Sequence, residues 1–188
     1  MDIVLASGSP RRKELLETLG LEFTICPAKG EECPPQGMGP DETVKALSLA
    51  KAREVAQVYP EALIIAADTI VWADSRILGK PRSEAQAEEM LALLSGTSHE
   101  VYTGVTLICG EKTVCRSECT KVFFRDLSEK EIRAYVKTGE PMDKAGAYGI
   151  QGRAAMMVRR IEGDYFNVMG LPLCALGQML EQIGVQLF

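Results

Sequence analysis

Residues 3–12 have the sequence Ile3-Val4-Leu5-Ala6-Ser7-Gly8-Ser9-Pro10-Arg11-Arg12. A short β-branched run that ends in small residues predicts a buried strand that enters a tight loop. Pro10 suits the first turn of a helix that follows this loop. The unpaired N–H groups at such a helix start favour a bound phosphate or carboxylate, and Arg11 and Arg12 add fixed positive charge. The segment therefore predicts an anion site; the alternative is an ordinary strand, turn and solvated helix face.

Length and composition predict a single soluble domain over residues 1–188. A chain of this length, with 46% hydrophobic residues, can bury a sizeable core. Its apolar stretches are far shorter than the roughly 20 residues that span a bilayer, and the N-terminus does not resemble a signal peptide. We therefore expect a cytoplasmic protein that does not contact a membrane.

Charge and residue counts exclude several classes of site. The net charge of -5 disfavours non-specific binding to nucleic-acid polymers, which needs many Lys and Arg contacts. The six cysteines contain no CxxC pair, which argues against a zinc or redox motif. His99 is the single histidine, so a multi-histidine metal centre is impossible and a metal should prefer oxygen ligands. We expect His99 to form a structural hydrogen bond in a turn.

The order of predicted elements indicates a mixed α/β sheet. Helices are expected over residues 11–19 and 41–59, and two capping-box patterns begin further helices at Ser83 and Ser128. Gly139 and Gly184 are typical helix stops. Strands are expected over residues 63–67, 70–73, 100–109, 113–124 and 154–161, with a hairpin turn at Gly110-Glu111.

Two short motifs carry candidate catalytic side chains. In Ala66-Ala67-Asp68-Thr69 an apolar strand ends in a carboxylate and a hydroxyl, which suits Asp68 as a general base or metal ligand. The alternative is an Asp that caps a turn. In Leu78-Gly79-Lys80-Pro81 the lysine stands between a permissive glycine and a rigid proline, so Lys80 is either held in place for a ligand or is a solvated hairpin residue.

Residues 139–152 form a glycine-punctuated segment that carries Asp143, Lys144 and Gln151. Loops rich in glycine often approach a ligand closely. The pattern differs from the Walker A loop and from the GxGxxG dinucleotide motif. Gln151 offers both a donor and an acceptor, which suits recognition of a base edge.

Taken together, six blocks resemble the Maf family of nucleoside triphosphate pyrophosphatases, and the resemblance runs nearly end to end. The blocks are Leu5–Leu16, Ala67-Asp68-Thr69, Gly79-Lys80-Pro81, Leu94–His99, Asp143–Gly152 and Asn167–Pro172. The resemblance implies a Maf/Ham1 (ITPase-like) fold, in which helices flank an elongated mixed sheet and a central cleft separates two lobes. It also implies hydrolysis of a nucleoside triphosphate to the monophosphate and pyrophosphate, with Mg²⁺ or Mn²⁺ as cofactor.

The resemblance also assigns roles to individual residues. Asp68 matches the family's proton acceptor, and Glu32, with Glu31 as the neighbouring alternative in register, matches an acidic residue at the site. Glu32 and Asp68 would then hold the metal. Ser7, Arg12, Lys51 and Lys80 would surround the triphosphate, although Lys51 alone would pass for a solvated helix residue.

Three positions differ between subgroups of the family, and here they are Arg11, Thr69 and Gln151. This combination resembles the subgroup that acts on dTTP and UTP, which also allows modified pyrimidines such as pseudo-UTP and 5-methyl-UTP. The implied duty is removal of non-standard nucleotides. Dimerisation is common in the family, so the resemblance allows a homodimer.

Two other functions stay open at this point. The chain could bind nucleotides as a regulator of cell division or septum formation, with little turnover. It could also be a phosphatase that uses the same basic residues to remove the terminal phosphate. The product distinguishes the two reactions, because pyrophosphate indicates attack at the α-phosphorus and orthophosphate indicates attack at the γ-phosphorus.

Overall fold

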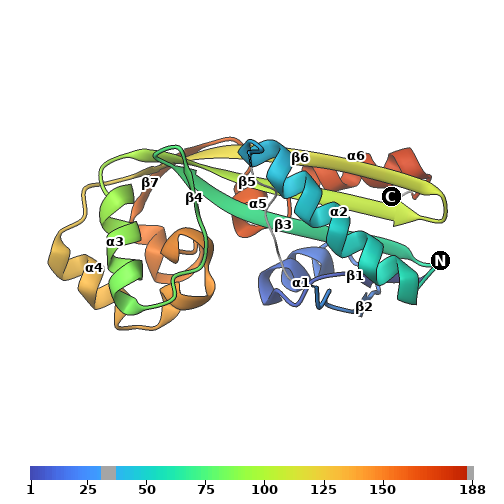
Figure 1. Ribbon diagram of the computed structural model, residues 1–188, viewed down its shortest axis with the longest axis horizontal. Coiled ribbons are helices and arrows are strands. Elements are labelled where there is room, and N and C mark those ends of the chain that lie inside the picture. The colour runs from blue at the N-terminus through green and yellow to red at the C-terminus, as the bar shows by residue number, and fades with distance from the viewer. Residues whose placement is uncertain (31–36, 186–188) are drawn as a thin grey trace. The chain divides into compact units, whose positions relative to one another are not determined.

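A computed structural model describes residues 1–30 and 37–185 of the chain. Within these residues seven strands form one mixed sheet, in the order β2-β1-β3-β5-β6-β7, with β4 paired to β3 (Figure 1). β1 is parallel to β2 and β3, whereas β4 and β7 are antiparallel to their partners. The strands are β1 (Ile3–Leu5), β2 (Thr24–Ile25), β3 (Leu63–Ala73), β4 (Arg76–Leu78), β5 (Ser98–Cys109), β6 (Lys112–Phe124) and β7 (Val158–Glu162). The predicted mixed α/β class is confirmed.

The helices begin and end close to the predicted signals. Pro10 and Pro40 occupy the first turns of their helices, Gly184 ends the last one with φ +91°, and Ser128 forms a complete capping box with Glu131. Ser83 forms half of one, because its Oγ accepts from the Gln86 N–H while the Gln86 amide oxygen accepts from the Arg82 N–H. The α-helices are α1 (Pro10–Glu17), α2 (Pro40–Val58), α3 (Glu84–Leu94), α4 (Glu129–Val136), α5 (Tyr165–Met169) and α6 (Leu173–Ile183).

The chain divides into two compact units. The first contains Met1–Asp68, Thr103–Glu118 and the chain from Gly170 onward, and the second contains Thr69–Tyr102 and Cys119–Met169. The strands β3, β5 and β6 therefore contribute residues to both units. The two predicted lobes correspond to these units, and the central cleft stays a prediction.

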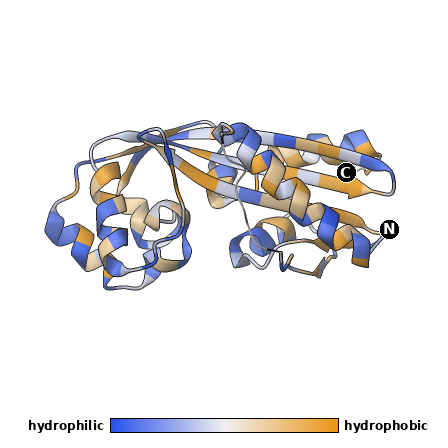
Figure 2. Cartoon of the chain, viewed as in Figure 1, coloured by the Kyte–Doolittle hydropathy of each residue, from blue (hydrophilic) through white to orange (hydrophobic). Residues whose placement is uncertain are grey.

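Each unit has its own apolar core. In the first unit, α2 buries Ala52 and Val55 against Ile64 of β3 and Val4 of β1. Figure 2 shows hydrophobic and hydrophilic residues alternating along α2, as expected for a helix with one buried face. In the second unit, the core includes residues from α3, α4, β5 and β6, namely Leu91, Leu94, Val101, Val122, Phe124, Ile132, Tyr135 and Val136.

Three predictions about strands are wrong. β3 runs without a break from Leu63 to Ala73, so Asp68 lies inside a strand and not at its end. The β-branched residues that follow Asp68 favour continued strand, and they outweigh the carboxylate as a stop signal. The predicted strand over residues 154–161 starts late, because 3-10 helix η3 (Gly152–Met156) occupies its first part. His99 lies in β5 and not in a turn.

β4 was not predicted. It forms a hairpin with β3 through Asp74 and Ser75, which have φ of 50° and 56°. Two positive φ values in succession define a type I′ turn, and the sequence Asp-Ser lacks the glycine that normally signals it.

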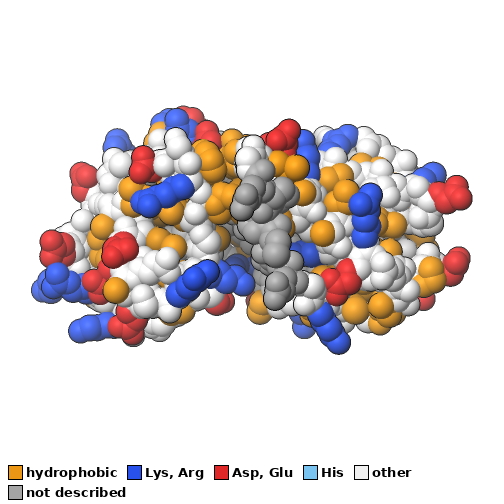
Figure 3. Space-filling model, in the orientation of Figure 1, with side chains coloured by type: hydrophobic (Ala, Val, Ile, Leu, Met, Phe, Trp, Pro, Cys, Tyr) orange, Lys and Arg blue, Asp and Glu red, His pale blue; other side chains and the backbone are white. Residues whose placement is uncertain are grey.

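The described surface carries mixed charge. Figure 3 shows basic and acidic side chains interspersed on the face drawn. The helices described here are all too short or too polar to cross a membrane.

Candidate active site

The loop after β1 is built around Ser7 and Arg12. The Ala6 N–H donates to the Ile65 carbonyl at 2.8 Å, which extends the β1–β3 pairing up to the loop. The buried Ser7 Oγ accepts from Arg12 Nη1 at 3.0 Å and from the Ser9 N–H at 3.3 Å. Arg12 Nε donates to the Gly170 carbonyl at 2.7 Å. The guanidinium is therefore held from two sides beside the start of α1, where N–H groups and the helix dipole favour an anion.

Lys51 and Asp68 form an ion pair that local sequence does not reveal. Lys51 Nζ, on α2, lies 2.5 Å from Asp68 Oδ1, and the two side chains are 16% and 8% exposed. A carboxylate inside a strand and paired with a lysine from a helix is not a turn cap. Breaking such a partly buried pair leaves an uncompensated charge, so each partner fixes the other.

Strand register places this ion pair beside the loop. β1 and β3 are parallel, with Leu5 opposite Ile65 as the last registered pair. Ser7 is two residues beyond Leu5, and Asp68 is three residues beyond Ile65. Both side chains therefore follow the same end of the β1–β3 pair within the first unit.

A carboxylate that the sequence did not point to holds the chain before residue 31. Glu54, on α2, accepts from the Lys29 N–H at 2.6 Å and from the Gly30 N–H at 3.0 Å. These backbone hydrogen bonds, Lys29 first, lower the pKa of the Glu54 carboxyl. Glu31 and Glu32 lie outside the described residues, so the structure does not test the metal-binding role expected for Glu32.

The remaining predicted residues belong to the second unit. Thr69 is half-buried in β3, whereas Lys80 and Gln151 are exposed. The Gly79 carbonyl, next to Lys80, accepts from the Gly146 N–H at 3.1 Å, so the lysine segment is tied to the glycine-punctuated segment. The structure thus brings Ser7, Arg12, Lys51 and Asp68 together in one unit, with Arg11 on the same helix as Arg12, and places Thr69, Lys80 and Gln151 in the other.

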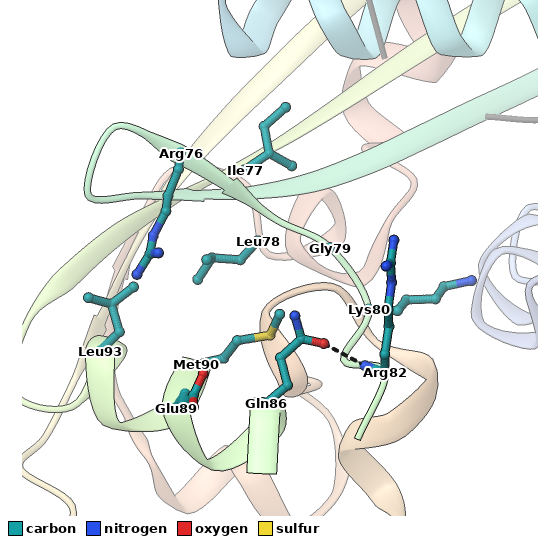
Figure 4. A pocket seen from close by; sticks show the side chains of 10 residues that line it. All are labelled: Arg76, Ile77, Leu78, Gly79, Lys80, Arg82, Gln86, Glu89, Met90 and Leu93. Atoms are coloured by element: carbon teal, nitrogen blue, oxygen red, sulfur yellow. Dashed lines mark hydrogen bonds between the residues drawn. The ribbon is translucent and has the colours of Figure 1, made fainter. Parts of the chain in front are cut away.

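Lys80 stands at the edge of a pocket of about 290 Å³ (Figure 4). Leu78, Met90 and Leu93 give the pocket an apolar lining, and Arg76 and Glu89 add charge. Figure 4 shows the Lys80 side chain extending away from Met90, so its ammonium group is directed out of the pocket.

A divalent cation fits this donor set only if the bound substrate and water supply the rest of its ligands. Among the described residues, no three His, Cys, Asp or Glu side chains converge on one point. Mg²⁺ usually binds one or two carboxylates and takes its other ligands from water and substrate phosphates. Asp68 is one suitable carboxylate, and Glu32 is the expected second.

His99 has the structural hydrogen bond that was predicted for it. The imidazole is buried, its Nε2 lies 2.7 Å from the Tyr148 hydroxyl, and both rings pack edge-on against Phe124. Burial lowers the pKa of His99 to about 4. The imidazole is therefore neutral at pH 7.

This neutral histidine makes stability depend on pH. In the unfolded chain the pKa of His99 is about 6.5. On acidification the unfolded state therefore binds a proton below pH 6.5, whereas the folded state binds it only when pH falls to about 4. The stabilisation is present above pH 6.5 and is lost as pH falls through this window. We expect the free energy of unfolding to drop by about 2–3 kcal/mol more in the wild type than in His99→Gln between pH 7 and pH 4. Urea unfolding of both proteins at several pH values measures this difference. The prediction would be contradicted if the free energies of unfolding of the two proteins fell in parallel with pH.

A protein-family model described as Maf-like protein matches residues 2–183. The chain belongs to the Maf family. A Bacillus cytotoxicus protein named dTTP/UTP pyrophosphatase is 52% identical over 179 residues, which cover 95% of this chain and 94% of that protein. A Symbiobacterium thermophilum protein of the same name is 50% identical and covers 99% of this chain and 96% of its own length.

Solved structures support the fold assignment of this Maf-family chain. The Ham1 protein of Staphylococcus aureus aligns with a TM-score of 0.54 at 13% identity, over 97% of this chain and 100% of that protein. At this identity the match concerns the fold alone. The expected Maf/Ham1-like architecture, with helices flanking a mixed sheet, is therefore confirmed.

Proposed function

We propose that this chain is a nucleoside triphosphate pyrophosphatase that hydrolyses dTTP and UTP to the monophosphate and pyrophosphate. The observation that carries the proposal is the Lys51–Asp68 ion pair beside the Ser7–Arg12 loop. It puts a carboxylate next to fixed cations, as hydrolysis of a polyanion requires. Family membership and the two relatives named dTTP/UTP pyrophosphatase support the same reaction and substrates.

In this mechanism Asp68 accepts a proton from the water that attacks the α-phosphorus. The bond between the α-phosphorus and its bridging oxygen to the β-phosphorus breaks, and pyrophosphate leaves with the electron pair. Phosphoryl transfer depends mainly on positioning and on neutralising oxygen charge. Arg12, Lys51 and Lys80 supply that charge, and the Ser7 loop orients the phosphates through its N–H groups.

Asp68 and Glu32 would hold a Mg²⁺ or Mn²⁺ ion against the triphosphate. Such an ion neutralises charge on the phosphate oxygens and makes water a better nucleophile. Asp68 keeps its place through Lys51, and Glu54 holds the backbone that leads toward Glu32.

Arg11, Thr69 and Gln151 set the choice of base in this proposal. A site that hydrogen-bonds one base edge rejects another, because the wrong base leaves buried polar groups unpaired. Thymine and uracil share the same imide edge, so modified pyrimidines that keep it, such as pseudo-UTP and 5-methyl-UTP, are expected substrates. The substrate in this proposal is a free nucleotide and not a nucleic-acid polymer. Residues 1–188 act as one domain in the cytoplasm. A homodimer is compatible with this role.

Product analysis tests the proposal directly. The purified chain is incubated with dTTP, UTP, CTP, ATP, GTP and 7-methyl-GTP, with Mg²⁺ and with Mn²⁺, and the products are separated by chromatography. Monophosphate and pyrophosphate from dTTP and UTP are the expected result. Orthophosphate would instead indicate a terminal phosphatase, and intact nucleotides throughout would favour a nucleotide-binding regulator.

Lys80→Ala provides a second test, because Lys80 is exposed and its loss should not disturb the fold. We expect kcat/KM for dTTP to fall about 100-fold, since one fixed charge on the phosphates is lost. The matched control is Arg76→Ala, which removes another cation from the same pocket in a residue without a proposed role. Equal activity of Lys80→Ala and the wild type would remove Lys80 from the site.

A further inference from the structure

The glycine-punctuated segment that carries Gln151 follows an irregular path. It contains the 3-10 helices η1 (Glu140–Asp143) and η2 (Ala145–Ala147) and leads into η3 at Gly152. Four of its residues have positive φ, namely Gly139, Gly146, Ala147 and Gly152. Helix or sheet hydrogen bonding cannot specify such a path, so side chains outside the regular elements must hold it.

Tyr135 and Glu140 hold the backbone just after Gln151. The buried Tyr135 hydroxyl, on α4, donates to Glu140 Oε1 at 3.1 Å. Glu140 Oε2 accepts from the Arg153 N–H at 3.4 Å. The backbone group that is held lies two residues after Gln151.

Close packing reinforces these hydrogen bonds. A Cβ on Gly152 would stand 3.0 Å from Glu140 Oε1, and its φ of +79° also favours glycine. A Cβ on Gly149 would stand 2.9 Å from the Lys144 stem, while Lys144 Nζ donates to the Glu140 carbonyl at 2.6 Å. Both glycines thus let side chains seat directly on the backbone that flanks Gln151.

The Tyr135 hydroxyl keeps its proton throughout the physiological range. Burial, and then the neighbouring Glu140 charge, raise the pKa of Tyr135. The hydroxyl therefore remains a donor to Glu140.

We propose that Tyr135 and Glu140 form a brace that positions Gln151 and so sets the preference for thymine and uracil over cytosine. This inference rests on the proposed function. Thymine and uracil present an N–H donor beside a carbonyl acceptor, whereas cytosine presents a ring acceptor beside an amino donor. A glutamine amide can present either pattern by rotating about its terminal bond. A fixed backbone sets the distance and direction from which the amide reaches the base, and so limits the pattern that it can meet with good geometry. Tyr135 and Glu140 are positioning residues, because they act through Gln151.

The test compares Tyr135→Phe and Glu140→Gln with the control Glu129→Gln. Glu129 lies on α4, as Tyr135 does, and is exposed. It pairs with Arg133 at 2.8 Å, away from the glycine-punctuated segment. We expect the ratio of kcat/KM for dTTP to that for dCTP to fall about 10-fold in both brace variants and to stay unchanged in the control. Hydrogen exchange of residues 145–155 should become faster in the brace variants alone.

Two results would overturn the brace: unchanged exchange in both variants, or an equal loss of activity on both nucleotides, which indicates a merely structural role. Circular dichroism identifies a variant that fails to fold, and Glu140→Gln, which keeps the size of the side chain, then decides. A wild type that hydrolyses no pyrimidine triphosphate would overturn the proposed function and the selectivity role with it. The exchange measurement would still show separately whether the brace holds the segment.

Discussion

Asp68→Asn is expected to lower kcat for dTTP about 10³-fold, the largest effect on activity that the structure predicts. The amide has nearly the same shape as the carboxylate but cannot accept a proton from the attacking water. The amide oxygen can still accept from Lys51 Nζ inside β3, so the substitution replaces the ion pair by a neutral hydrogen bond and keeps the strand. Nucleotide binding should weaken far less than kcat, since Ser7, Arg12 and Lys80 are untouched and only one of the two expected metal ligands is lost.

Single-turnover kinetics and calorimetry with a non-hydrolysable α,β-imido analogue of dUTP separate these two expectations. Asp41→Asn is the matched control, because Asp41 lies in the same unit and pairs with Lys45 at 2.6 Å but has no proposed catalytic role. A kcat for Asp68→Asn within about fivefold of the wild type would exclude Asp68 as the proton acceptor, since a general base contributes at least about 10²-fold.

The part of the site that could be predicted from sequence is the part that local structure encodes. The strand, turn and helix around Ser7 and Arg12 follow from an apolar run, small residues and a proline at the helix start. Within the loop, the Ser7 Oγ bonds to Ser9 and Arg12 are local in the sequence, whereas Arg12 also donates to the distant Gly170 carbonyl.

The rest of the site depends on contacts between distant segments. Lys51 has the sequence environment of a solvated helix residue, and only the packing of α2 on β3 brings it to Asp68. Asp68 stays a predicted site residue, but the strand end that suggested it is wrong, because the strand continues past it. Tyr135 and Glu140 gave no signal, since their contacts depend on an irregular segment whose path no periodicity describes.

Gly104→Ala is expected to lower the free energy of unfolding by about 3 kcal/mol or more. Gly104 lies in β5, and a Cβ there would overlap the Val44 carbonyl group and approach the Lys45 N–H of α2. These are backbone atoms of a helix, so no side-chain rotation relieves the overlap and α2 must move. Because α2 carries Lys51, the variant should also lose activity. Urea unfolding followed by circular dichroism measures the loss of stability.

Gly177→Ala isolates the steric argument from the general effect of replacing a glycine. Gly177 lies inside α6 in the same unit, and a Cβ there meets nothing within 4 Å. Alanine is the better helix former, so this variant should be more stable than the wild type by about 0.5–1 kcal/mol. The two substitutions add the same methyl group and are expected to have opposite signs, which is a stricter test than either change alone. If Gly104→Ala proved as stable as Gly177→Ala, α2 would not approach β5 closely, and the packing that carries Lys51 to Asp68 would have to be revised.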